Sequence, residues 1–341
     1  MSKLKKEKII NDPIYGFIKI ETGIILDIIE HPFFQRLRRI SQLGLSYLVY
    51  PGAYHTRFHH ALGCLFLMNK AIEQLRKKGH TITNKEEEAV CLAILLHDIG
   101  HSPFSHALEK SIVNNINHED ISLLFMQKLD EQFNGKLSLA IKIFQNKYKK
   151  KFLHQLISSQ LDMDRLDYLT RDSFYSGVQE GVIGTERIIN MLNVVENKLV
   201  IEEKGIYSIE KFLIARRLMY WQVYLHKTVL SAENTLIKVM KRAKEVASID
   251  KRLFASDALI FFIKNKFTRR DLKKNHQIVQ QFAQLDDHDI FASLKQWTKH
   301  KDFVLSSLSR MIIERKLLKV KIKNQPFTQK EIIQYKKIVI K

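Results

Sequence analysis

The residues best suited to chemistry lie in one stretch of fifteen residues, from Leu92 to His106. Apolar residues typical of a buried helix lead into the pair His97 and Asp98, and a turn containing glycine and proline then presents His101 and His106. Imidazole nitrogens and carboxylate oxygens are ordinary ligands of zinc, iron and manganese. We therefore expect a metal site at this point of the chain, completed by ligands from elsewhere.

The helix that carries these residues must end at the metal site. Adjacent residues on a regular helix point about 100° apart, so His97 and Asp98 can share one ion only across a helix terminus. The other ligands we expect are His60, near the start of another predicted helix, and an aspartate from residues 160–172. Two imidazoles and two carboxylates leave positions open for water, as catalysis requires. The alternative is a set of hydrogen-bonded polar residues within a core.

The elements that must position these residues are mostly helices, with minor β structure. Thr83 to Glu86 is a capping box that opens the helix ending at His97. No internal repeat, low-complexity segment or clear linker divides the chain. Besides that helix, the pattern predicts a short strand within residues 11–20, helices over 33–43, 60–78, 152–172 and 208–244, and a small hairpin over 198–209.

Length and composition favour a cytoplasmic globular protein. The 341 residues, 45% of them hydrophobic, are enough for a large core. The two cysteines, Cys64 and Cys91, lie in apolar helical patterns, which argues against a disulfide framework. No signal-type apolar run follows the charged N-terminal residues, and no stretch approaches the roughly 18–20 apolar residues needed to span a membrane. We expect a reducing, cytoplasmic location.

The charge balance favours anionic partners. The chain has 56 basic and 36 acidic residues, a net charge of +20. Such a field attracts nucleic acid, phosphorylated small molecules or a membrane surface. Charge alone does not choose among these partners, and a basic solvated surface is the simplest alternative.

The order of the candidate ligands carries a family resemblance. His60, His97–Asp98 and Asp164 resemble the H…HD…D signature of the HD-domain phosphohydrolases. The surrounding residues look like the deoxynucleoside triphosphate (dNTP) triphosphohydrolase branch in its bacterial form, over roughly residues 8–240. The resemblance implies a helical HD-domain fold with a catalytic core over 1–245 and a basic, mostly helical lobe over 246–341 packed on it. It rests on the segments 42–44, 55–63, 97–106, 162–172 and 224–227, with a weaker match at 315–319.

The resemblance also assigns the candidate site. It implies one divalent metal ion (manganese, iron, zinc or magnesium), with additional magnesium accompanying the triphosphate. Asp162 is the rival of Asp164 as a ligand, but the family uses the second aspartate of this motif. The implied metal ligands are His60, His97, Asp98 and Asp164; the implied catalytic residues are His101, His106, Glu109 and His118; and the implied substrate-binding residues are Gln42, Leu43, Arg57, Arg165, Tyr168, Asp172, Arg216 and Tyr224.

The reaction implied by the resemblance is hydrolysis of dNTPs to deoxynucleoside and inorganic triphosphate. Relatives are often oligomers with a nucleotide activator between subunits, so a homo-oligomer (dimer or tetramer) is expected. The positions that resemble the activator site are Lys8, Glu30, Gln35, Arg38, Arg315 and Lys319.

Two other functions stay open. One is an HD phosphohydrolase or phosphodiesterase acting on another nucleotide or on single-stranded nucleic acid, which the net charge would also suit. The other is a non-catalytic nucleic-acid-binding or assembly module with a structural metal. A closed structural site would leave the three additional histidines without a role, which favours an enzyme.

Overall fold

The structure is a computed structural model that describes residues 7–113, 116–323 and 325–340. It is mostly helical with minor β structure, as predicted, and the β structure consists of two small antiparallel hairpins. In chain order the helices are α1 (Ile24–Glu30), α2 (Pro32–Gln35), α3 (Arg57–Lys77), α4 (Asn84–Leu95), α5 (Glu109–Ile112), α6 (His118–Gln132), α7 (Ser138–Phe144), α8 (Lys151–Gln155), α9 (Met163–Ser176), α10 (Thr185–Asn190), α11 (Ile206–Met219), α12 (Lys227–Ala247), α13 (Asp257–Lys264), α14 (Arg269–Lys274), α15 (His276–Gln284), α16 (Asp287–Trp297), α17 (Phe303–Ile313) and α18 (Gln329–Ile340).

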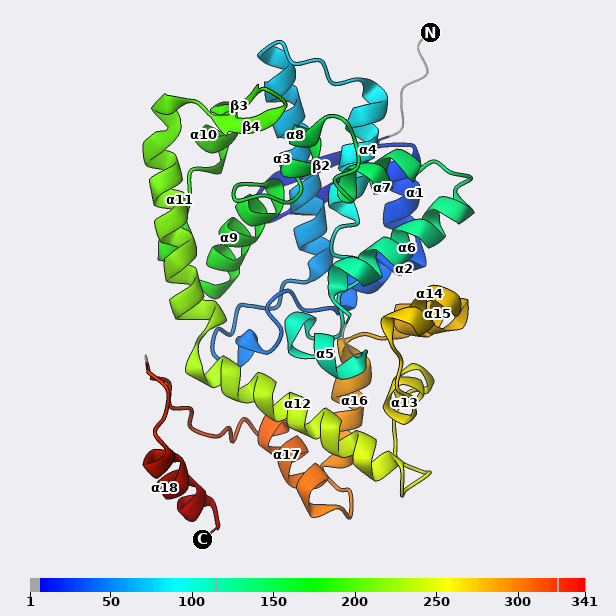
Figure 1. Ribbon diagram of the computed structural model, residues 1–341, viewed down its shortest axis with the longest axis vertical. Coiled ribbons are helices and arrows are strands. Elements are labelled where there is room, and N and C mark those ends of the chain that lie inside the picture. Colours follow the sequence, from blue (N-terminus) through cyan, green and yellow to red (C-terminus); the bar gives the residue numbers. More distant parts are fainter. Residues whose placement is uncertain (1–6, 114–115, 324, 341) are drawn as a thin grey trace.

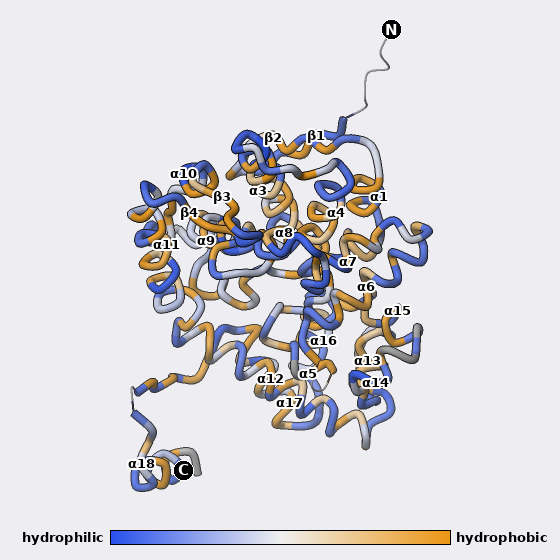
Figure 2. Tube along the Cα trace, turned by 45° about the horizontal axis from the view of Figure 1, so that its top comes forward, coloured by the Kyte–Doolittle hydropathy of each residue, from blue (hydrophilic) through white to orange (hydrophobic). Residues whose placement is uncertain are grey.

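The helices form two groups joined by α12 (Figure 1). In the first group α3 packs against both α4 and α9, and α4 also packs against α7. Helix α12 crosses below this group and packs against α13 and α17 of the second. Helix α18 lies apart from both groups at the end of an extended segment (Figures 1 and 2). No helix in the described part of the chain is long and apolar enough to cross a membrane.

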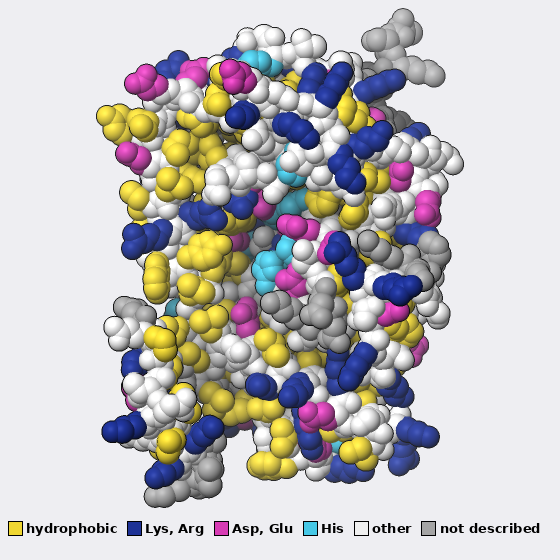
Figure 3. All heavy atoms as spheres, viewed as in Figure 1, with side chains coloured by type: hydrophobic (Ala, Val, Ile, Leu, Met, Phe, Trp, Pro, Cys, Tyr) yellow, Lys and Arg dark blue, Asp and Glu magenta, His cyan; other side chains and the backbone are white. Residues whose placement is uncertain are grey.

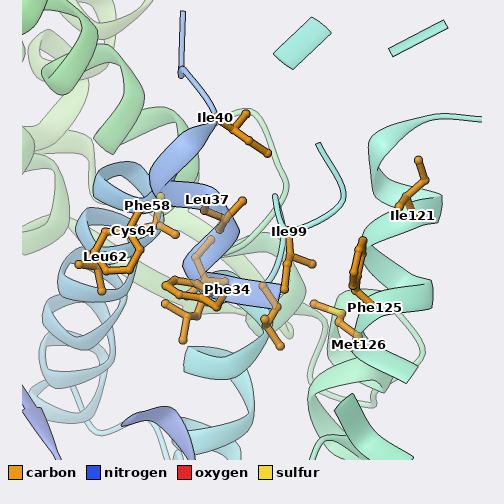
Figure 4. Packing of buried hydrophobic residues seen from close by; sticks show 14 of the residues in the cluster. Phe34, Leu37, Ile40, Phe58, Leu62, Cys64, Ile99, Ile121, Phe125 and Met126 are labelled. Atoms are coloured by element: carbon orange, nitrogen blue, oxygen red, sulfur yellow. The ribbon is translucent and has the colours of Figure 1, made fainter. Parts of the chain in front are cut away.

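The core between these helices is apolar and continuous. Hydrophobic residues recur along the helices of the first group (Figure 2), and residues of α2, α3 and α6 meet around Phe34 (Figure 4). The Phe34 and Phe58 rings pack edge to face with centroids 5.4 Å apart. Both side chains are buried, as is almost all of the apolar stretch that precedes His97. The helices that carry the candidate ligands are therefore fixed by packing rather than by surface contacts.

Each hairpin uses neighbouring segments. Strand β1 (Glu7–Asp12) pairs with β2 (Gly16–Glu21), and β3 (Leu192–Val195) pairs with β4 (Lys198–Ile201). The sequence pattern had paired Lys198–Ile201 with residues 206–209, which was wrong, because those residues begin α11. Glu196 and Asn197 both adopt a left-handed φ, which gives the two-residue turn between β3 and β4 the twist that a tight hairpin needs.

Two predicted long helices are interrupted, and each break serves the site. The predicted helix over 208–244 is α11 and α12, separated by a π-helical turn at Tyr220–Tyr224 and by His226, which caps α12. The predicted helix over 152–172 is α8 and α9, and Asp162 caps α9 by accepting a hydrogen bond from the Arg165 backbone. Helical periodicity continues across both breaks, which is why the sequence did not reveal them.

Two other predicted helices differ at their ends. The helix predicted over 33–43 ends at Arg39, after a short 3₁₀ turn, and the next residues lead into a single bridge between Ser41 and Thr56. The helix predicted from residue 60 begins at Arg57, because Thr56 and His59 form a capping box. The capping box predicted at Thr83 and Glu86 is confirmed.

A fully buried arginine joins the two groups of helices. The Arg36 guanidinium donates hydrogen bonds to the carbonyls of Ile99 (3.3 Å), His101 (2.7 Å) and Leu285. Asp287, at the start of α16, accepts further bonds from the Phe104 backbone (2.7 Å) and the Ser41 backbone (2.8 Å). The turn after the His-Asp pair is therefore held by residues from both groups.

Replacing Arg36 should be costly. Arg36→Met leaves three buried carbonyls without a donor, and we expect it to lower the free energy of unfolding by about 3 kcal/mol. Arg39→Met is the matched control, because Arg39 is half-exposed and its buried partner Asp286 still accepts a hydrogen bond from the His288 backbone, so its loss should cost clearly less than that of Arg36. Urea unfolding of both variants tests this, and equal losses would contradict the role given to Arg36.

Candidate metal centre and substrate cavity

Four of the predicted ligands meet where three helices end or begin. His60 lies in the first turn of α3, His97 and Asp98 follow the end of α4, and Asp164 lies in the first turn of α9. The Nε2 atom of His60 lies 3.1 Å from Asp164 and 3.6 Å from Asp98. The Nε2 atom of His97 lies 3.4 Å from Asp98 and 3.6 Å from Asp164. The four side chains therefore surround one point.

The hydrogen bonds around both histidines suit a metal. His60 Nδ1 donates to Asp167 Oδ2 over 2.7 Å, and His97 Nδ1 donates to the Ile94 carbonyl over 2.6 Å. Each Nδ1–H is thereby occupied, so each Nε2 lone pair faces the carboxylates of Asp98 and Asp164. The buried His97 Nε2 has no hydrogen-bond partner. Lone pairs facing carboxylates at these distances repel unless a cation lies among them, so the donor set fits a divalent metal ion.

The charges of the candidate ligands agree with this reading. Burial raises the pKa of Asp98, but the Arg57 and His97 side chains beside it bring that pKa well below its usual value. Burial alone would lower the pKa of His60, yet the neighbouring Cys64 and the carboxylates of Asp164 and Asp167 raise it well above its usual value. Asp98 is therefore held as a carboxylate, and the strong attraction between His60 and its acidic neighbours marks a place where a cation is stabilised.

The structure distinguishes Asp164 from its rival Asp162. The Asp162 carboxylate is fully buried and accepts bonds from the backbones of Ser159 (2.7 Å) and Arg165 (2.8 Å), as well as from the Arg165 guanidinium. Burial and the charge of Asp164 raise the pKa of Asp162 to about 7. The hydrogen bonds that cap α9 thus occupy the Asp162 carboxylate, whereas the Asp164 carboxylate faces His60 and His97.

A buried ion pair supports the metal centre from behind. Asp167 accepts hydrogen bonds from His60 and from both Nε and Nη2 of Arg171 (2.9 and 3.0 Å), and Arg171 also pairs with Asp12 at 2.8 Å. Gly63 leaves the space for this, because a Cβ there would lie 1.9 Å from Asp167 Oδ1 and 2.3 Å from Arg171 Nη2. The sequence analysis missed this set, although Asp167 follows Asp164 by three residues on the same helix.

The three additional histidines form a cluster beside the centre. His101 stacks on His118 with ring centroids 4.0 Å apart, and His106 meets both rings edge to face. Glu109 accepts hydrogen bonds from His118 Nδ1 (2.8 Å) and His106 Nδ1 (3.2 Å), as the predicted acidic partner should. Burial opposes the charge of Glu109, but the bonds from His106 and His118 bring its pKa far below its usual value. His106 itself is exposed to solvent.

Beside the histidine cluster lies a cavity of about 380 Å³. Histidine and acidic side chains gather at a hollow near the middle of this face, with cationic and apolar side chains around it (Figure 3). All eight predicted substrate-binding residues line the cavity, together with Asp98, Asp164 and the three histidines of the cluster. Arg57 donates to Ser105 Oγ over 2.8 Å and to Asp98, which fixes its position between the metal centre and the cavity.

One side of the cavity is aromatic. Tyr224, presented by the π-helical turn, donates its hydroxyl to Asp172 over 2.8 Å and meets the Tyr168 ring edge to face. His55 Nε2 lies 2.7 Å from the other oxygen of Asp172. Nearby, the buried Gln42 Oε1 has no hydrogen-bond partner. This side of the cavity therefore offers two rings and a free acceptor to a ligand.

The residues predicted to form an activator site fall into two places. Lys8 pairs with Glu30, and Arg38 Nε donates to Gln35 Oε1 over 2.8 Å, so four of them lie around α1 and α2. Arg315 instead donates to the Leu48 carbonyl over 2.7 Å, and Lys319 is exposed in the segment after α17. Among the described residues, no hydrogen bond or ion pair joins the two sets within one chain.

Comparisons with known proteins agree with this geometry. Residues 57–172 match the HD domain family, and residues 183–259 match a family described as the HD associated region. The uncharacterized protein YwfO of Bacillus subtilis is 35% identical over 324 residues, which cover 92% of this chain and 72% of YwfO. A crystal structure of a phosphohydrolase from Bacteroides thetaiotaomicron superposes with a TM-score of 0.94 at 55% identity, covering 98% of this chain and 84% of that chain.

A more distant relative has a named activity. The SAMHD1 homolog of Dictyostelium discoideum, a deoxynucleoside triphosphate triphosphohydrolase, is 31% identical over 271 residues. The match covers 74% of this chain and 52% of that protein, so this chain spans about half the length of the relative.

The hydrogen bond behind His60 gives a prediction about metal affinity. Asp167→Asn weakens the acceptor that orients His60, and we expect metal affinity to fall by about 10- to 100-fold. Competition with a chelator, followed by metal analysis, measures this. Asp257→Asn, an exposed position at the start of α13, is the matched control and should leave the affinity unchanged. An Asp167→Asn protein that is folded and binds metal as the parent does would contradict the assignment.

Proposed function

Because this chain belongs to the HD-domain phosphohydrolase superfamily, we propose that it hydrolyses dNTPs to deoxynucleoside and inorganic triphosphate. One observation carries the proposal. A single cavity brings two of the candidate metal ligands, Asp98 and Asp164, together with three arginines and a tyrosine-lined wall, which suit the triphosphate and the sugar of a dNTP. The dNTP triphosphohydrolase activity of a relative at 31% identity is consistent with this choice.

The metal would be held by His60, His97, Asp98 and Asp164. A divalent ion bound there supplies Lewis-acid polarisation of a phosphoryl oxygen and activation of a water molecule. The chain itself holds Asp98 as a carboxylate through the neighbouring Arg57, and it orients His60 through Asp167 behind it.

The arginines bind the triphosphate. Arg57, Arg165 and Arg216 line the cavity, and their planar guanidinium groups suit the adjacent oxygens of a polyphosphate. The positive charge stabilises the negative charge that develops on the α-phosphoryl oxygens as water attacks and the 5′ alkoxide leaves. Because Arg57 is already held by Ser105 and Asp98, its side chain loses little conformational freedom when the triphosphate binds.

The histidine cluster supplies the proton that the leaving 5′ oxygen needs. We assign His106 as the general acid that protonates the leaving 5′ oxygen of the deoxynucleoside. Its Nδ1 is held by Glu109, so its Nε2 is the atom free to meet a ligand in the cavity. His101 and His118 would contact the phosphates beside it.

The aromatic wall accounts for selection of deoxyribose. Tyr168 and Tyr224 line the cavity around Asp172, and Tyr224 is fixed by its bond to that carboxylate. A ring held against the 2′ carbon leaves no room for a ribose hydroxyl. Gln42, whose Oε1 has no partner, is placed to accept a hydrogen bond from the 3′ hydroxyl.

The exposed surface supports assembly into a homo-oligomer. Helix α11 presents several large apolar side chains to solvent, among them Ile206, Tyr207, Leu213 and Ile214. A second copy would cover this face. Assembly would also give the residues around Lys8 and those around Arg315 an opportunity to meet across an interface as a nucleotide activator site. We propose a cytoplasmic oligomer regulated in this way.

The activity is tested by chromatography of products. Metal-loaded protein is incubated with each of the four dNTPs and with ATP and GTP, with and without the other nucleotides. We expect equal amounts of deoxynucleoside and triphosphate from dNTPs, little product from the ribonucleotides, and a loss of at least about 100-fold in Asp164→Asn because a metal ligand is removed.

The matched control is Asp257→Asn, which should retain full activity. Release of a nucleoside monophosphate or of single phosphates from dNTPs would contradict the proposal and favour a different phosphohydrolase. Absence of any product, under all activator conditions, would contradict the dNTP triphosphohydrolase activity.

A further inference from the structure

Glu233, on α12, is a carboxylate in the cavity that has no partner. It lines the cavity with its neighbour Val229 on the same helix. No hydrogen bond or ion pair connects it to any described residue. Burial raises the pKa of Glu233 to about 7, as expected for a carboxyl group that has lost water and gained no donor. A half-buried acid of this kind costs stability, and it is explained most simply by a ligand that supplies the donors.

The surroundings of Glu233 disfavour the triphosphate as its ligand. A Cβ on Gly44 would lie 3.4 Å from Glu233 Oε1 and 3.1 Å from the Phe104 carbonyl oxygen, so the carboxylate and this carbonyl lie on the same side of Gly44. Gly44 has a left-handed φ and no side chain, which keeps the space in front of Glu233 open. A carboxylate beside a carbonyl oxygen repels phosphate and attracts N–H groups. The part of a dNTP that offers N–H groups is the base.

We propose that Glu233 reads the base of the substrate and makes guanine the preferred one. This inference rests on the proposed function. Guanine presents two adjacent donors, N1–H and the N2 amino group, which one carboxylate can accept side by side in a charge-assisted pair. Adenine and cytosine each place an acceptor beside their amino group, and thymine flanks its single N–H with two carbonyls. The ionised form of Glu233 therefore gains from each of these three bases only one bond, accompanied by repulsion.

The remaining lining fits a base at this end. Leu43, next to Gly44, and Val229 offer apolar surface for the faces of a planar ring. Tyr168, Asp172 and Tyr224 occupy the wall assigned to the sugar, and the arginines occupy the phosphate end. Glu233 is thus the charged residue left for the edge of the base.

The test compares dGTP with dITP, which differs only by lacking the N2 amino group. The kcat/KM for dGTP, dITP and dTTP is measured for the parent protein, for Glu233→Gln and for Glu245→Gln. Glu245 lies further along α12, pairs with Arg242 and is the matched control. We expect the parent and Glu245→Gln to prefer dGTP over dITP by about 10-fold or more, and Glu233→Gln to bring that ratio close to one.

The outcomes separate this inference from the proposed activity. If the parent hydrolyses dNTPs but shows no preference for dGTP over dITP, or if Glu233→Gln keeps that preference, the role of Glu233 is overturned. If the parent releases other products, equilibrium binding of dGTP and dITP to metal-stripped protein replaces the kinetic comparison. A preference in binding that disappears in Glu233→Gln supports the inference even then, and equal binding overturns it. Glu233→Asp, which keeps the charge but shortens the reach, should fall between the two.

Discussion

The site depends on one buried interaction, the contact of Asp167 with both His60 and Arg171. It fixes which nitrogen of His60 carries the proton and so aims the other nitrogen at Asp98 and Asp164. A charge this deeply buried is tolerated only because Arg171 neutralises it, and Arg171 is in turn shared with Asp12 of the first hairpin. Gly63 makes room for the pair. The metal centre is thus built into the core rather than placed on its surface.

A second constraint is that the cavity belongs to both groups of helices. Arg36 and Asp287 hold the turn between the His-Asp pair and Ser105, and each does so with bonds that cross between the groups. Helix α12 brings Val229 and Glu233 to the same cavity from the far side of the π-helical turn. The candidate metal ligands and the residues proposed to contact the sugar and the base therefore come from different segments that pack as one unit, and the HD associated region contributes to the candidate site.

The sequence was sufficient to predict the helical fold, and the predicted ligands do converge, because residue type, order and helix-end signals mark them locally. Asp164 could be chosen over Asp162 only by resemblance, and its physical reason, the capping role of Asp162, needed coordinates. The strand predicted to pair with Lys198–Ile201 was wrong, because the turn at Glu196 and Asn197 contains no glycine and the sequence therefore gives no turn signal there. The break at Tyr220–Tyr224 leaves helical periodicity intact. Asp167 was missed because its role depends on His60, which is far away in the sequence. Glu233 was missed because its lack of a partner is visible only in the folded structure.

In the proposed reaction water attacks the α-phosphorus, so that the bond to the 5′ oxygen breaks and the triphosphate is released intact. Hydrolysis of a dNTP in water enriched in ¹⁸O, followed by mass spectrometry of both products, tests this step. We expect one ¹⁸O atom in the inorganic triphosphate and none in the deoxynucleoside. Label in the deoxynucleoside would mean attack at carbon, and label in pyrophosphate or orthophosphate would mean attack at another phosphorus; either result would contradict the proposed reaction.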